Sequence, residues 1–496
     1  MGKTGPGALL ACIDLELNQG FPVYHRLYLE LRKAILNGDL TPGMKLPSTR
    51  ALAEDMGLSR TPVKAAYERL KGEGYASTIV GSGTVVSQAV GRITATTPGT
   101  ESNVPERAEI QSPISQRGAL GASAIWYSKR DEARPFTPHL IAFDSLPMRV
   151  WSRLVARQWR RSDNDILGYC PLGGLGALRE ALSKHLKIFR GVECEPEQVV
   201  ITPGVQSAYF VLAQMLAQPG DGICVEDPGD IGARSAFVAA GLSIVPVPVD
   251  SDGFNPPAHV SDHSARLAHI TPSRQWPLGV TMGLARRLQV LEWAKANDIW
   301  IIEDDYDSEL SYKGKHVPAL QGLDRAGRVL YVGTFTKILF SSLRIGYAVL
   351  PHGLVDPFIR LVEAMTRGAS GALQAALAQF IDEGYFNAHI RQMRKIHTQR
   401  RQALIEAARE EIGDLMNLHH SDTGAHLIGW LPDDIDPDAV SREAERRNIT
   451  AIPISRYCIS PYPRGGLMLG FGHTRPENIG PAVRELALSI RDASRS

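Results

Sequence analysis

The spacing of hydrophobic residues divides this chain of 496 residues into three regions. Over residues 22–88, hydrophobic side chains recur with the period of a helix and are followed by two short strand-like runs. Farther along, Thr, Ser, Gly, Pro and Ala dominate and the periodicity is lost, as is typical of a linker. We therefore predict a small domain over 15–88, a flexible linker over 89–135 and a large domain over 136–496, because a chain of this length exceeds what one hydrophobic core supports.

Three helices are predicted in the small domain. The first covers residues 24–36, where leucine and isoleucine side chains share one face. Ser48 stands at the N-cap position of the second helix, 49–56, and Ser59 at that of the third, 60–73. The small domain is therefore expected to begin as a helical bundle.

The third predicted helix has a hydrophobic face and a polar, basic face. Its hydrophobic residues recur at intervals of three and four, whereas its basic residues project from the other side. Two short strands, 75–80 and 84–87, follow it and are joined by a turn between glycines, which predicts a hairpin. A helix, a short turn and a second helix with a basic start are typical of DNA recognition, with the hairpin as a wing. The alternative is an exposed, charged helix pair that binds no ligand.

Strand-like hydrophobic runs alternate with helical segments along the large domain. Such alternation indicates an α/β domain built on a mostly parallel sheet. The predicted strands are residues 199–202, 222–226, 243–249, 267–271, 299–303, 329–332 and 346–350.

The charge distribution indicates a class of binding partner, and the cysteine content indicates a cellular compartment. Residues 22–88 hold nine Lys and Arg against six Asp and Glu, whereas the rest of the chain holds 45 against 47. A small basic module on a nearly neutral body favours a polyanionic partner. The five cysteines are scattered without a C-x-x-C pair, which predicts no disulfide framework, no metal site of the zinc type and a reducing cytoplasm. No run of about 18 hydrophobic residues is present, so no membrane span is expected.

The strongest chemical pattern lies where two predicted strands of the large domain end. Asp304 and Tyr306 follow one strand, and ligand crevices form at such strand ends. Lys337 follows the next strand, after two threonine hydroxyls, and Arg344 comes seven residues later. A lysine amine can form a Schiff base with an aldehyde, while hydroxyls and a guanidinium hold the phosphate of a phosphorylated aldehyde.

Pyridoxal 5'-phosphate fits every part of this pattern. Asp304 would keep the ring nitrogen protonated, and Tyr306 would hydrogen-bond the phenolic oxygen. The turn at 204–206 opens a predicted helix, whose N–H groups and positive dipole would complete the phosphate site. A Thr-x-Thr-Lys sequence alone is usually a solvated loop, so the order and spacing of the whole set support the cofactor.

The small domain resembles the GntR-type winged helix-turn-helix over its whole length. The matching runs are Leu46-Pro47-Ser48-Thr49-Arg50, Gly57-Leu58-Ser59-Arg60, Ala66-Tyr67-Glu68-Arg69-Leu70, Glu73-Gly74-Tyr75 and Gly81-Ser82-Gly83-Thr84. The resemblance implies that double-stranded operator DNA is contacted by Arg50, Arg60, Thr61 and Lys64, and by the wing at Ser82 and Gly83. The two arginines would hold base edges or phosphates through paired hydrogen bonds. Thr61-Pro62 replaces the usual Asn-Thr, which favours a different base preference.

From about residue 136 onward, the chain resembles fold-type I aminotransferases, and as a whole it resembles the MocR-type transcriptional regulators. The matching segments are Gly168-Tyr169, Gly173-Gly174-Leu175, Leu178-Arg179-Glu180-Ala181, 202–206, 226–229, 271–277, 302–307, 333–337 and 343–347. The resemblance implies a Schiff base on Lys337, with Asp304 on the ring nitrogen. The implied phosphate ligands are Thr334, Thr336, Arg344, Gly204, Val205 and Gln206, with Tyr169 reaching the phosphate of the partner subunit. It also implies a head-to-tail homodimer in which each winged helix packs on the other large domain.

Three positions depart from the aminotransferase pattern around the substrate. Asp230 stands where an aromatic residue usually stacks on the cofactor ring. Arg274 replaces a usual histidine, and Met468 replaces the arginine that clamps the substrate carboxylate. A thioether cannot pair with an anion, so an α-amino acid held in the usual pose is not expected. Arg274 is the candidate replacement cation of this effector pocket, and the alternative for it is a structural ion pair.

Two functions follow from these patterns. The favoured one is a cytoplasmic, DNA-binding transcriptional regulator, not an enzyme, that holds pyridoxal 5'-phosphate on Lys337 and senses a small amine or amino-acid-like effector. The effector would carry its acidic group as a sulfonate or a distal carboxylate, or would be pyridoxal 5'-phosphate itself. The alternative is a working aminotransferase with an appended DNA-binding domain, which Met468 disfavours because turnover requires a fixed acid group.

Overall fold

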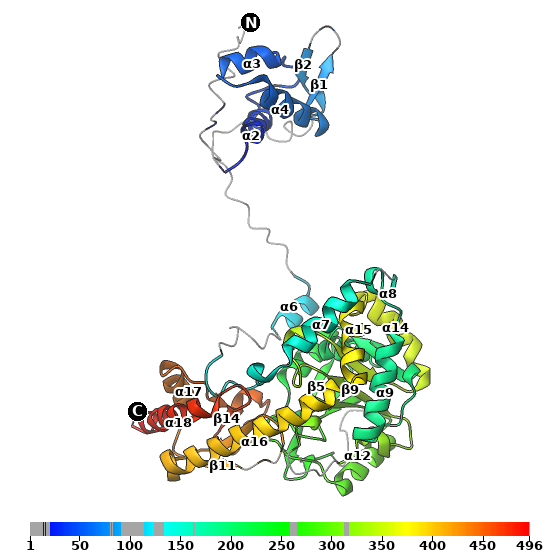
Figure 1. The fold of residues 1–496 in the computed structure, drawn as a ribbon, viewed down its shortest axis with the longest axis vertical. Helices are drawn as coiled ribbons and strands as arrows, with labels where there is room; N and C mark the ends of the chain where they lie inside the picture. Colours follow the sequence, from blue (N-terminus) through cyan, green and yellow to red (C-terminus); the bar gives the residue numbers. More distant parts are fainter. Residues whose placement is uncertain are drawn as a thin grey trace. The chain divides into compact units, whose positions relative to one another are not determined.

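The computed structural model describes residues 13, 15, 20–79, 81, 83–90, 114–123, 133–161, 164–257, 265–311, 317–419, 421 and 423–495. The chain separates into two compact units, Met1–Ser112 and Pro113–Ser496, and Figure 1 colours both along the sequence. In the part of the chain that the structure describes, no helix is long and apolar enough to cross a membrane.

The small unit combines helices with a two-stranded antiparallel sheet. Its main elements are α2 (Val23–Leu36), α3 (Thr49–Asp55), α4 (Arg60–Gly72), β1 (Ala76–Ile79) and β2 (Gly83–Val86). Leucines from all three helices meet in one buried core. In the sheet, Ala76 pairs with Val86 and Ile79 with Gly83, which confirms the predicted hairpin. The unit is thus the winged helix-turn-helix that the sequence predicted.

Of the two serines predicted to cap helices in this unit, one makes a capping hydrogen bond with its side chain and the other does not. Ser48 caps α3, because its hydroxyl accepts a hydrogen bond from the N–H of Ala51 at 3.1 Å. Ser59 occupies the N-cap position of α4 but makes no capping hydrogen bond with its side chain, so that detail of the prediction is wrong. The third residue of α4 is Pro62, which lacks the N–H that a capping serine usually engages.

An eight-stranded sheet forms the centre of the large unit. Its strands are β3 (Val199–Thr202), β4 (Gly222–Asp227), β5 (Ser243–Asp250), β6 (Gly253–Phe254), β7 (Ala265–Ile270), β8 (Trp300–Asp305), β9 (Val329–Thr334) and β10 (Gly346–Val349). They lie in the order β3-β10-β9-β8-β7-β4-β5-β6. Neighbours run parallel except that β10 is antiparallel to β3 and β9, and β6 to β5. The predicted mostly parallel sheet is confirmed.

Both faces of this sheet are buried. Along β3, Val199 and Ile201 join one hydrophobic cluster, whereas Val200 joins another. β10 alternates in the same way, with Tyr347 in the first cluster and Ala348 in the second. The first cluster packs on α9 (Gly176–Arg190) and α15 (Gly371–Asp382), and the second on α10 (Val205–Leu216), α11 (Ile231–Ala240) and α14 (His352–Thr366). Two-sided burial explains why these strands are continuous hydrophobic runs in the sequence.

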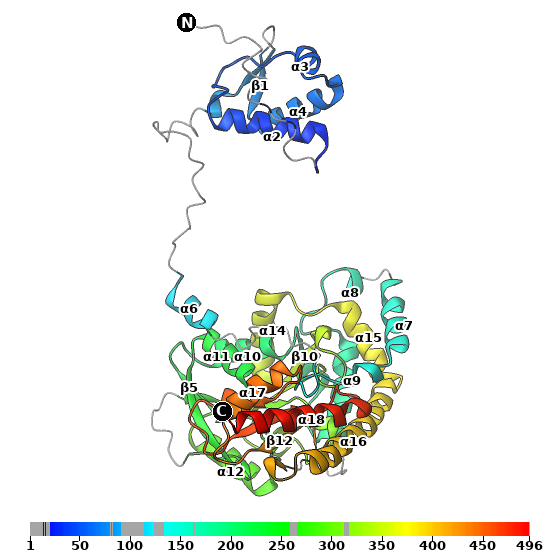
Figure 2. The ribbon, with the colours of Figure 1, turned by 90° about the vertical axis from the view of Figure 1, so that its left-hand side faces the viewer.

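A smaller antiparallel sheet follows in the last part of the chain. Its strands are β11 (Asn417–His419), β12 (His426–Trp430), β13 (Ile452–Pro453) and β14 (Gly466–Gly470), in the order β11-β12-β14-β13. The helices α16 (Tyr385–Glu411), α17 (Pro437–Arg446) and α18 (Pro476–Ala493) share a core with it, and Figure 2 shows them close together. The sequence analysis predicted none of these strands, because β11 and β13 have only two or three residues and glycines shorten the hydrophobic runs of β12 and β14.

The predicted linker, 89–135, contains a helix that the sequence analysis did not expect. Helix α6 (Gln116–Ser123) contacts α11 closely enough that a β-carbon on Gly121 would lie 3.7 Å from that of Ala239. Small side chains on both helices allow this approach. The linker was predicted to be mostly irregular, and α6 is a helical stretch within it. The other helices of the large unit are α7 (Met148–Trp159), α8 (Asn164–Leu167), α12 (Leu284–Ala296) and α13 (Leu320–Leu323).

Candidate cofactor site and DNA-binding surface

The strand order brings the predicted cofactor residues to one edge of the large sheet. Asp304 lies near the end of β8, and Thr334 is the last residue of β9. Because β10 runs antiparallel, its first residue, Gly346, pairs with both Thr334 and Thr202 at the end of β3. The segments that follow β3, β8 and β9 therefore meet the segment that precedes β10.

The start of α10 and Arg344 form a cradle for an anion. Gly204 is the N-cap of α10 and has a φ of +88°, a conformation that favours glycine. A β-carbon on Gly204 would lie 3.4 Å from the guanidinium carbon of Arg344. The first N–H groups of α10, at Val205 and Gln206, are those that a helix leaves without intrahelical partners. A guanidinium beside a helix N-terminus suits a phosphate group.

Two threonine hydroxyls extend this cradle. Oγ1 of Thr334 lies 3.1 Å from Oγ1 of Thr336, and the N–H of Thr336 donates to Oγ1 of Thr334 at 3.2 Å. The amide nitrogen Nε2 of Gln206 would lie 2.7 Å from a β-carbon on Gly232, so the start of α11 adjoins the same place. The residues of this chain that are predicted to hold the phosphate thus lie on segments that adjoin at this edge of the sheet.

Asp304 carries a buried oxygen that accepts no hydrogen bond from the described residues. Its side chain is 4% exposed, Oδ2 lies 3.6 Å from Nε2 of His269, and Oδ1 has no donor in the described part of the chain. Burial raises the pKa of Asp304, and the nearby Asp304 carboxylate raises the pKa of His269 although burial opposes this shift. A buried carboxylate oxygen without a donor is costly. A protonated ring nitrogen would supply the donor, so Asp304 fits pyridoxal 5'-phosphate.

The amine of Lys337 faces an imidazole that the sequence analysis did not single out. Nζ of Lys337 lies 2.9 Å from Nδ1 of His139 and 5.7 Å from the ring centre of Trp276. His139 comes from the first segment of the large unit, 198 positions away in the chain. Only the fold brings the two residues together, because no local motif surrounds His139.

Arg274 is held by groups of its own chain. Its Nη1 lies 3.4 Å from Oδ2 of Asp307 and 3.4 Å from the hydroxyl of Tyr306, and Nη2 donates to the backbone oxygen of His426 at 3.1 Å. The side chain is 1% exposed, and any side chain at Gly424 would overlap it. Burial raises the pKa of Asp307 to about 6 although Arg274 opposes the shift. The structure therefore contains the ion pair that the sequence left as the alternative for Arg274.

The other two departures from the aminotransferase pattern also have structural roles. Met468 is fully buried in a hydrophobic cluster with Trp276 and Tyr457, and its sulfur lies 3.9 Å from the hydroxyl of Tyr457. Asp230 caps α11, because its carboxylate accepts a hydrogen bond from the N–H of Ala233 at 2.9 Å. Neither a thioether nor a carboxylate can supply a positive charge for an effector's acid group.

Tyr306 and Tyr169 lie in contrasting surroundings. Burial raises the pKa of Tyr306 well above its usual value, so its phenol stays protonated and can donate a hydrogen bond. Tyr169 is 80% exposed, and its ring packs against the guanidinium of Arg367 at 5.7 Å. An exposed tyrosine is compatible with the predicted role in a partner subunit, which stays a prediction.

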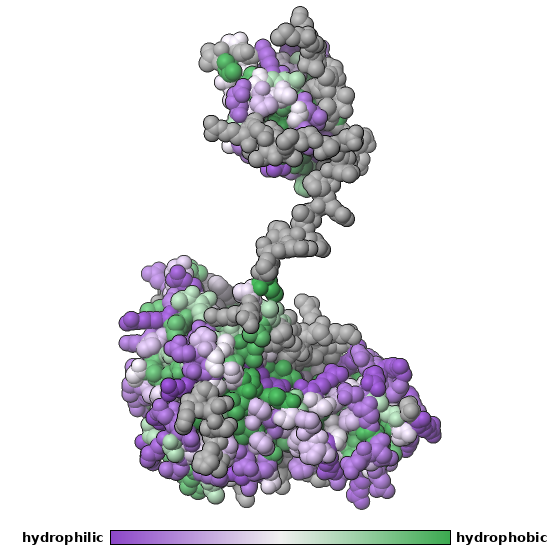
Figure 3. Space-filling view, turned by 180° about the vertical axis from the view of Figure 1, so that it is seen from behind, coloured by the Kyte–Doolittle hydropathy of each residue, from purple (hydrophilic) through white to green (hydrophobic). Residues whose placement is uncertain are grey.

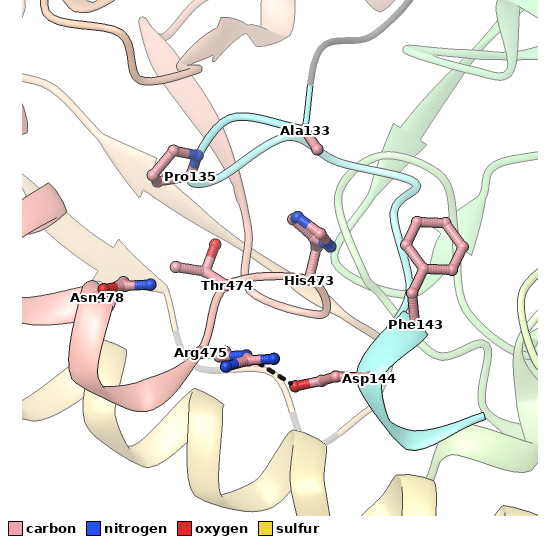
Figure 4. Close-up of a pocket in the computed structure, with 8 residues that line it drawn as sticks. All are labelled: Ala133, Pro135, Phe143, Asp144, His473, Thr474, Arg475 and Asn478. Atoms are coloured by element: carbon pink, nitrogen blue, oxygen red, sulfur yellow. Dashed lines mark ion pairs between the residues drawn. The ribbon is translucent and has the colours of Figure 1, made fainter. Parts of the chain in front are cut away.

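A pocket of about 510 Å³ in the large unit lies apart from this site. Figure 4 shows it with an ion pair, in which Nε of Arg475 lies 3.3 Å from Oδ2 of Asp144. Asp144 also pairs with Arg400 at 2.8 Å. None of the predicted cofactor, effector or DNA-binding residues lines this pocket; its lining is Ala133, Pro135, Phe143, Asp144, His473, Thr474, Arg475 and Asn478.

The predicted DNA-binding residues of the small unit lie on its surface. The exposed ones on α3 and at the start of α4 are Arg50, Arg60, Thr61 and Lys64. Nε of Arg60 donates to Oγ1 of Thr49 at 3.2 Å, which links the two helices on their polar side. In the predicted wing, Gly83 is exposed and Ser82 lies outside the described residues. Lys45, which the sequence analysis missed, has Cε 3.5 Å from the β-carbon position of Gly83.

Each of the two units matches a different protein family. Residues 23–86 match the bacterial regulatory proteins of the gntR family, and residues 143–432 match aminotransferase class I and II. Among solved structures, a kynurenine aminotransferase from Pyrococcus horikoshii is 25% identical, with a TM-score of 0.67 over 77% of this chain and 95% of that one. The aminotransferase fold implies a site for pyridoxal 5'-phosphate, which the donors described above fit.

Relatives with both units extend over almost the whole chain. The probable rhizopine catabolism regulatory protein MocR of Rhizobium meliloti is 37% identical over 480 residues, covering 95% of this chain and 94% of that protein. The pyridoxine biosynthesis transcriptional regulator PdxR of Corynebacterium glutamicum is 29% identical over 97% of this chain and 99% of its own. The chain therefore belongs to the MocR-type transcriptional regulators, in which a GntR-type DNA-binding winged helix is joined to an aminotransferase-like domain.

Proposed function

We propose that this regulator holds pyridoxal 5'-phosphate on Lys337 and senses a small primary amine. When bound, that group supplies an aldehyde that forms a Schiff base with a primary amine. The observation that carries the proposal is the meeting of three complementary parts at one sheet edge. These are the Lys337 amine, the unsatisfied oxygen of Asp304, and the cradle of Arg344 at the start of α10.

Each residue of this edge has a separate task in the proposal. Lys337 supplies the amine, Asp304 accepts a hydrogen bond from the ring nitrogen, and Tyr306 donates to the phenolic oxygen. Phosphate oxygens are held by hydroxyls, N–H groups and a guanidinium. The residues proposed for the phosphate are Thr334, Thr336, Arg344, Gly204, Val205 and Gln206, with Tyr169 of a second subunit.

The effector proposed is an amine without an α-carboxylate in the usual place. Met468 stands at the position of the carboxylate clamp and is buried among rings, and Arg274 is already paired with Asp307. An α-carboxylate would therefore be desolvated without a cation, which is costly. An amine with a sulfonate or distal carboxylate, or pyridoxal 5'-phosphate itself, avoids that cost. One relative is named for rhizopine catabolism and another for pyridoxine biosynthesis, so the effector must be found with this protein.

A titration of the protein loaded with pyridoxal 5'-phosphate tests this effector class. Each α-amino acid is compared with its decarboxylated amine, together with amines that carry a sulfonate or a distal carboxylate. We expect an absorbance shift with the amines at concentrations at least about tenfold lower than with the matching α-amino acids, equivalent to about 1.4 kcal/mol. Equal or tighter binding of the ordinary α-amino acids contradicts the proposal.

The same titration distinguishes a sensor from an aminotransferase. The resemblance to the kynurenine aminotransferase structure favours turnover as a second candidate function. With an oxo acid added, a sensor shows a spectral shift that stays constant and yields no oxo product. Steady formation of an oxo product identifies a working aminotransferase instead.

We also propose that the protein acts on DNA as a head-to-tail homodimer in the cytoplasm, where its operator lies. Figure 3 shows hydrophobic residues gathered in a band on one face of the large unit, with hydrophilic residues on both sides. Such a patch supports an interface between subunits. The exposed ring of Tyr169 would then reach the cofactor of the partner.

Arg60 is expected to be a main contact with the operator. An Arg60→Ala variant should bind operator DNA about 10- to 100-fold more weakly in a mobility-shift assay, because a paired arginine contact contributes roughly 1–3 kcal/mol. Lys33→Ala is the matched control, since Lys33 is exposed and basic but lies on α2. Unchanged affinity of the Arg60 variant, or an equal loss in the Lys33 variant, contradicts this role.

A further inference from the structure

The backbone at His139 has a conformation that disfavours residues other than glycine. Its φ is +70°, in the left-handed region. Such outliers persist where the surrounding structure enforces them, and they concentrate at functional sites. At His139 the conformation brings Nδ1 to 2.9 Å from Nζ of Lys337. The strained residue is therefore the one that contacts the proposed attachment point.

The segment that carries His139 is fixed to the smaller sheet. The N–H of Gly470 in β14 donates to the backbone oxygen of Phe136 at 2.9 Å, and the N–H of Phe136 donates to Oγ1 of Thr474 at 3.2 Å. A β-carbon on Gly470 would lie 2.8 Å from Cα of Pro138, so the segment lies directly against the strand. These contacts hold the backbone of residues 136–138, which leads directly into His139.

Ring contacts fix the imidazole itself. The rings of His139 and Trp276 are 4.5 Å apart at an interplanar angle of 34°, and Trp276 contacts His426 at 4.8 Å. Nε2 of His426 lies 2.8 Å from the backbone oxygen of Pro277. The imidazole of His139 is thus oriented on one side by an indole, with Nδ1 toward the lysine. Because the imidazole is already oriented, little conformational entropy is lost when it accepts a proton.

The charges around His139 keep its imidazole neutral. Burial, the charge of Lys337 and His426 lower the pKa of His139 well below its usual value. Burial and Arg274 likewise lower the pKa of His426. Nη1 of Arg274 also lies 3.4 Å from Oδ2 of Asp307, and the charge of Lys337 acts on this carboxylate as well. A neutral imidazole can accept a hydrogen bond from an ammonium group and then its proton.

We propose that His139 is the proton acceptor for the ε-ammonium group of Lys337. This inference rests on the proposed function, because the amine must lose a proton before it can attack an aldehyde. One proton passes from Nζ to Nδ1, and the lone pair of the amine forms the new C–N bond with the aldehyde carbon. The aldehyde oxygen leaves as water with the two remaining amine hydrogens, and His139 passes its proton to solvent. When an effector amine replaces the lysine, the lysine amine returns to its hydrogen bond with His139.

The test compares apoprotein variants by the rate at which they condense with pyridoxal 5'-phosphate, followed by stopped-flow absorbance. His139→Gly removes the imidazole and suits the φ of +70°, so its thermal midpoint should be no lower than that of the wild type. We expect its rate at neutral pH to fall about 100-fold, which is typical of a lost general base. His139→Asn, which tolerates this backbone but does not titrate near neutral pH, should be equally slow. Asn448→Gly, at an exposed position that also has a positive φ, is the control and should keep the wild-type rate.

Added imidazole and pH distinguish proton transfer from a structural role. Imidazole should raise the rate of the His139→Gly variant about tenfold and leave His139→Asn unchanged, because only glycine leaves room for the base. The wild-type rate should vary little around neutral pH, whereas the variant rate should rise with pH as hydroxide replaces the histidine. An unchanged rate in His139→Gly, or a slow rate that imidazole does not raise, overturns the role of His139 alone. If the wild type itself forms no adduct, the proposed function and this inference both fall.

Discussion

A Lys337→Ala variant is expected to lose the covalent link to pyridoxal 5'-phosphate and the absorbance band that comes with it. The reaction requires a primary amine at the sheet edge, and alanine has none. The phosphate cradle at Gly204 and Arg344 is unchanged, so weak binding should remain, with the apparent affinity lowered at least about tenfold. Borohydride reduction followed by mass spectrometry should find the cofactor on the peptide containing Lys337 in the wild type and on no peptide of the variant.

The control for this experiment is Lys395→Ala. Lys395 is an exposed lysine of α16, away from the sheet edge, so its loss should leave band and adduct unchanged. The Lys337 variant should also fail to change its operator affinity when the effector amine is added. A Lys337→Ala protein that keeps the band and the reducible adduct would show that another amine holds the cofactor.

The large sheet could be predicted to within one or two residues at most strand ends. β3 was predicted with both ends correct, and β4 extends one residue beyond its prediction. The reason is physical, because strands buried on both faces are continuous hydrophobic runs that end abruptly at polar loops. The direction of β10 could not be predicted, since its hydrophobic run looks the same in either orientation.

The parts that the sequence analysis missed depend on contacts between distant segments or on small residues. Helix α6 is composed largely of Gly, Ala and Ser, which have no helical hydrophobic pattern, and its packing against α11 is what identifies it. The strands β11 and β13 have only two or three residues, and glycines shorten the hydrophobic runs of β12 and β14. Stability in both cases comes from tertiary packing.

In the candidate site, too, some residues could be predicted from the sequence and others could not. Asp304, Thr334 and Lys337 could be grouped from sequence because each follows a strand and such strand ends share an edge. His139 could not be grouped with them, because its position depends on the hydrogen bond between Phe136 and Gly470 of β14. The structure pairs Arg274 with Asp307, which corresponds to the ion-pair alternative that the sequence left open.

An Asp304→Asn variant is expected to separate the stability of the apoprotein from its affinity for the cofactor. The folded state raises the pKa of Asp304 through burial, so above that pKa the ionised carboxylate destabilises the fold, and asparagine removes this cost. Asp304 also raises the pKa of His269, so His269 is protonated toward acidic pH in the wild type. Its positive charge then offsets the cost of the buried carboxylate, whereas the variant has no carboxylate to offset. The difference in thermal midpoint between variant and wild type should therefore increase in favour of the variant from roughly pH 6 to roughly pH 9.

The Asp304→Asn variant should bind the cofactor more weakly than the wild type, although its apoprotein is more stable. Asparagine carries no charge for a protonated ring nitrogen, and a hydrogen bond to a charged group contributes about 1.5–3 kcal/mol, so the affinity should fall roughly 10- to 100-fold. Equilibrium titration by absorbance measures this, and Asp433→Asn, at an exposed loop carboxylate, should match the wild type in both experiments. If the Asp304 variant binds the cofactor as tightly as the wild type, the orphaned oxygen of Asp304 is not the partner of the ring nitrogen. In that case the gain in stability at high pH would still be expected, because it arises in the apoprotein from the buried carboxylate and its neighbour His269.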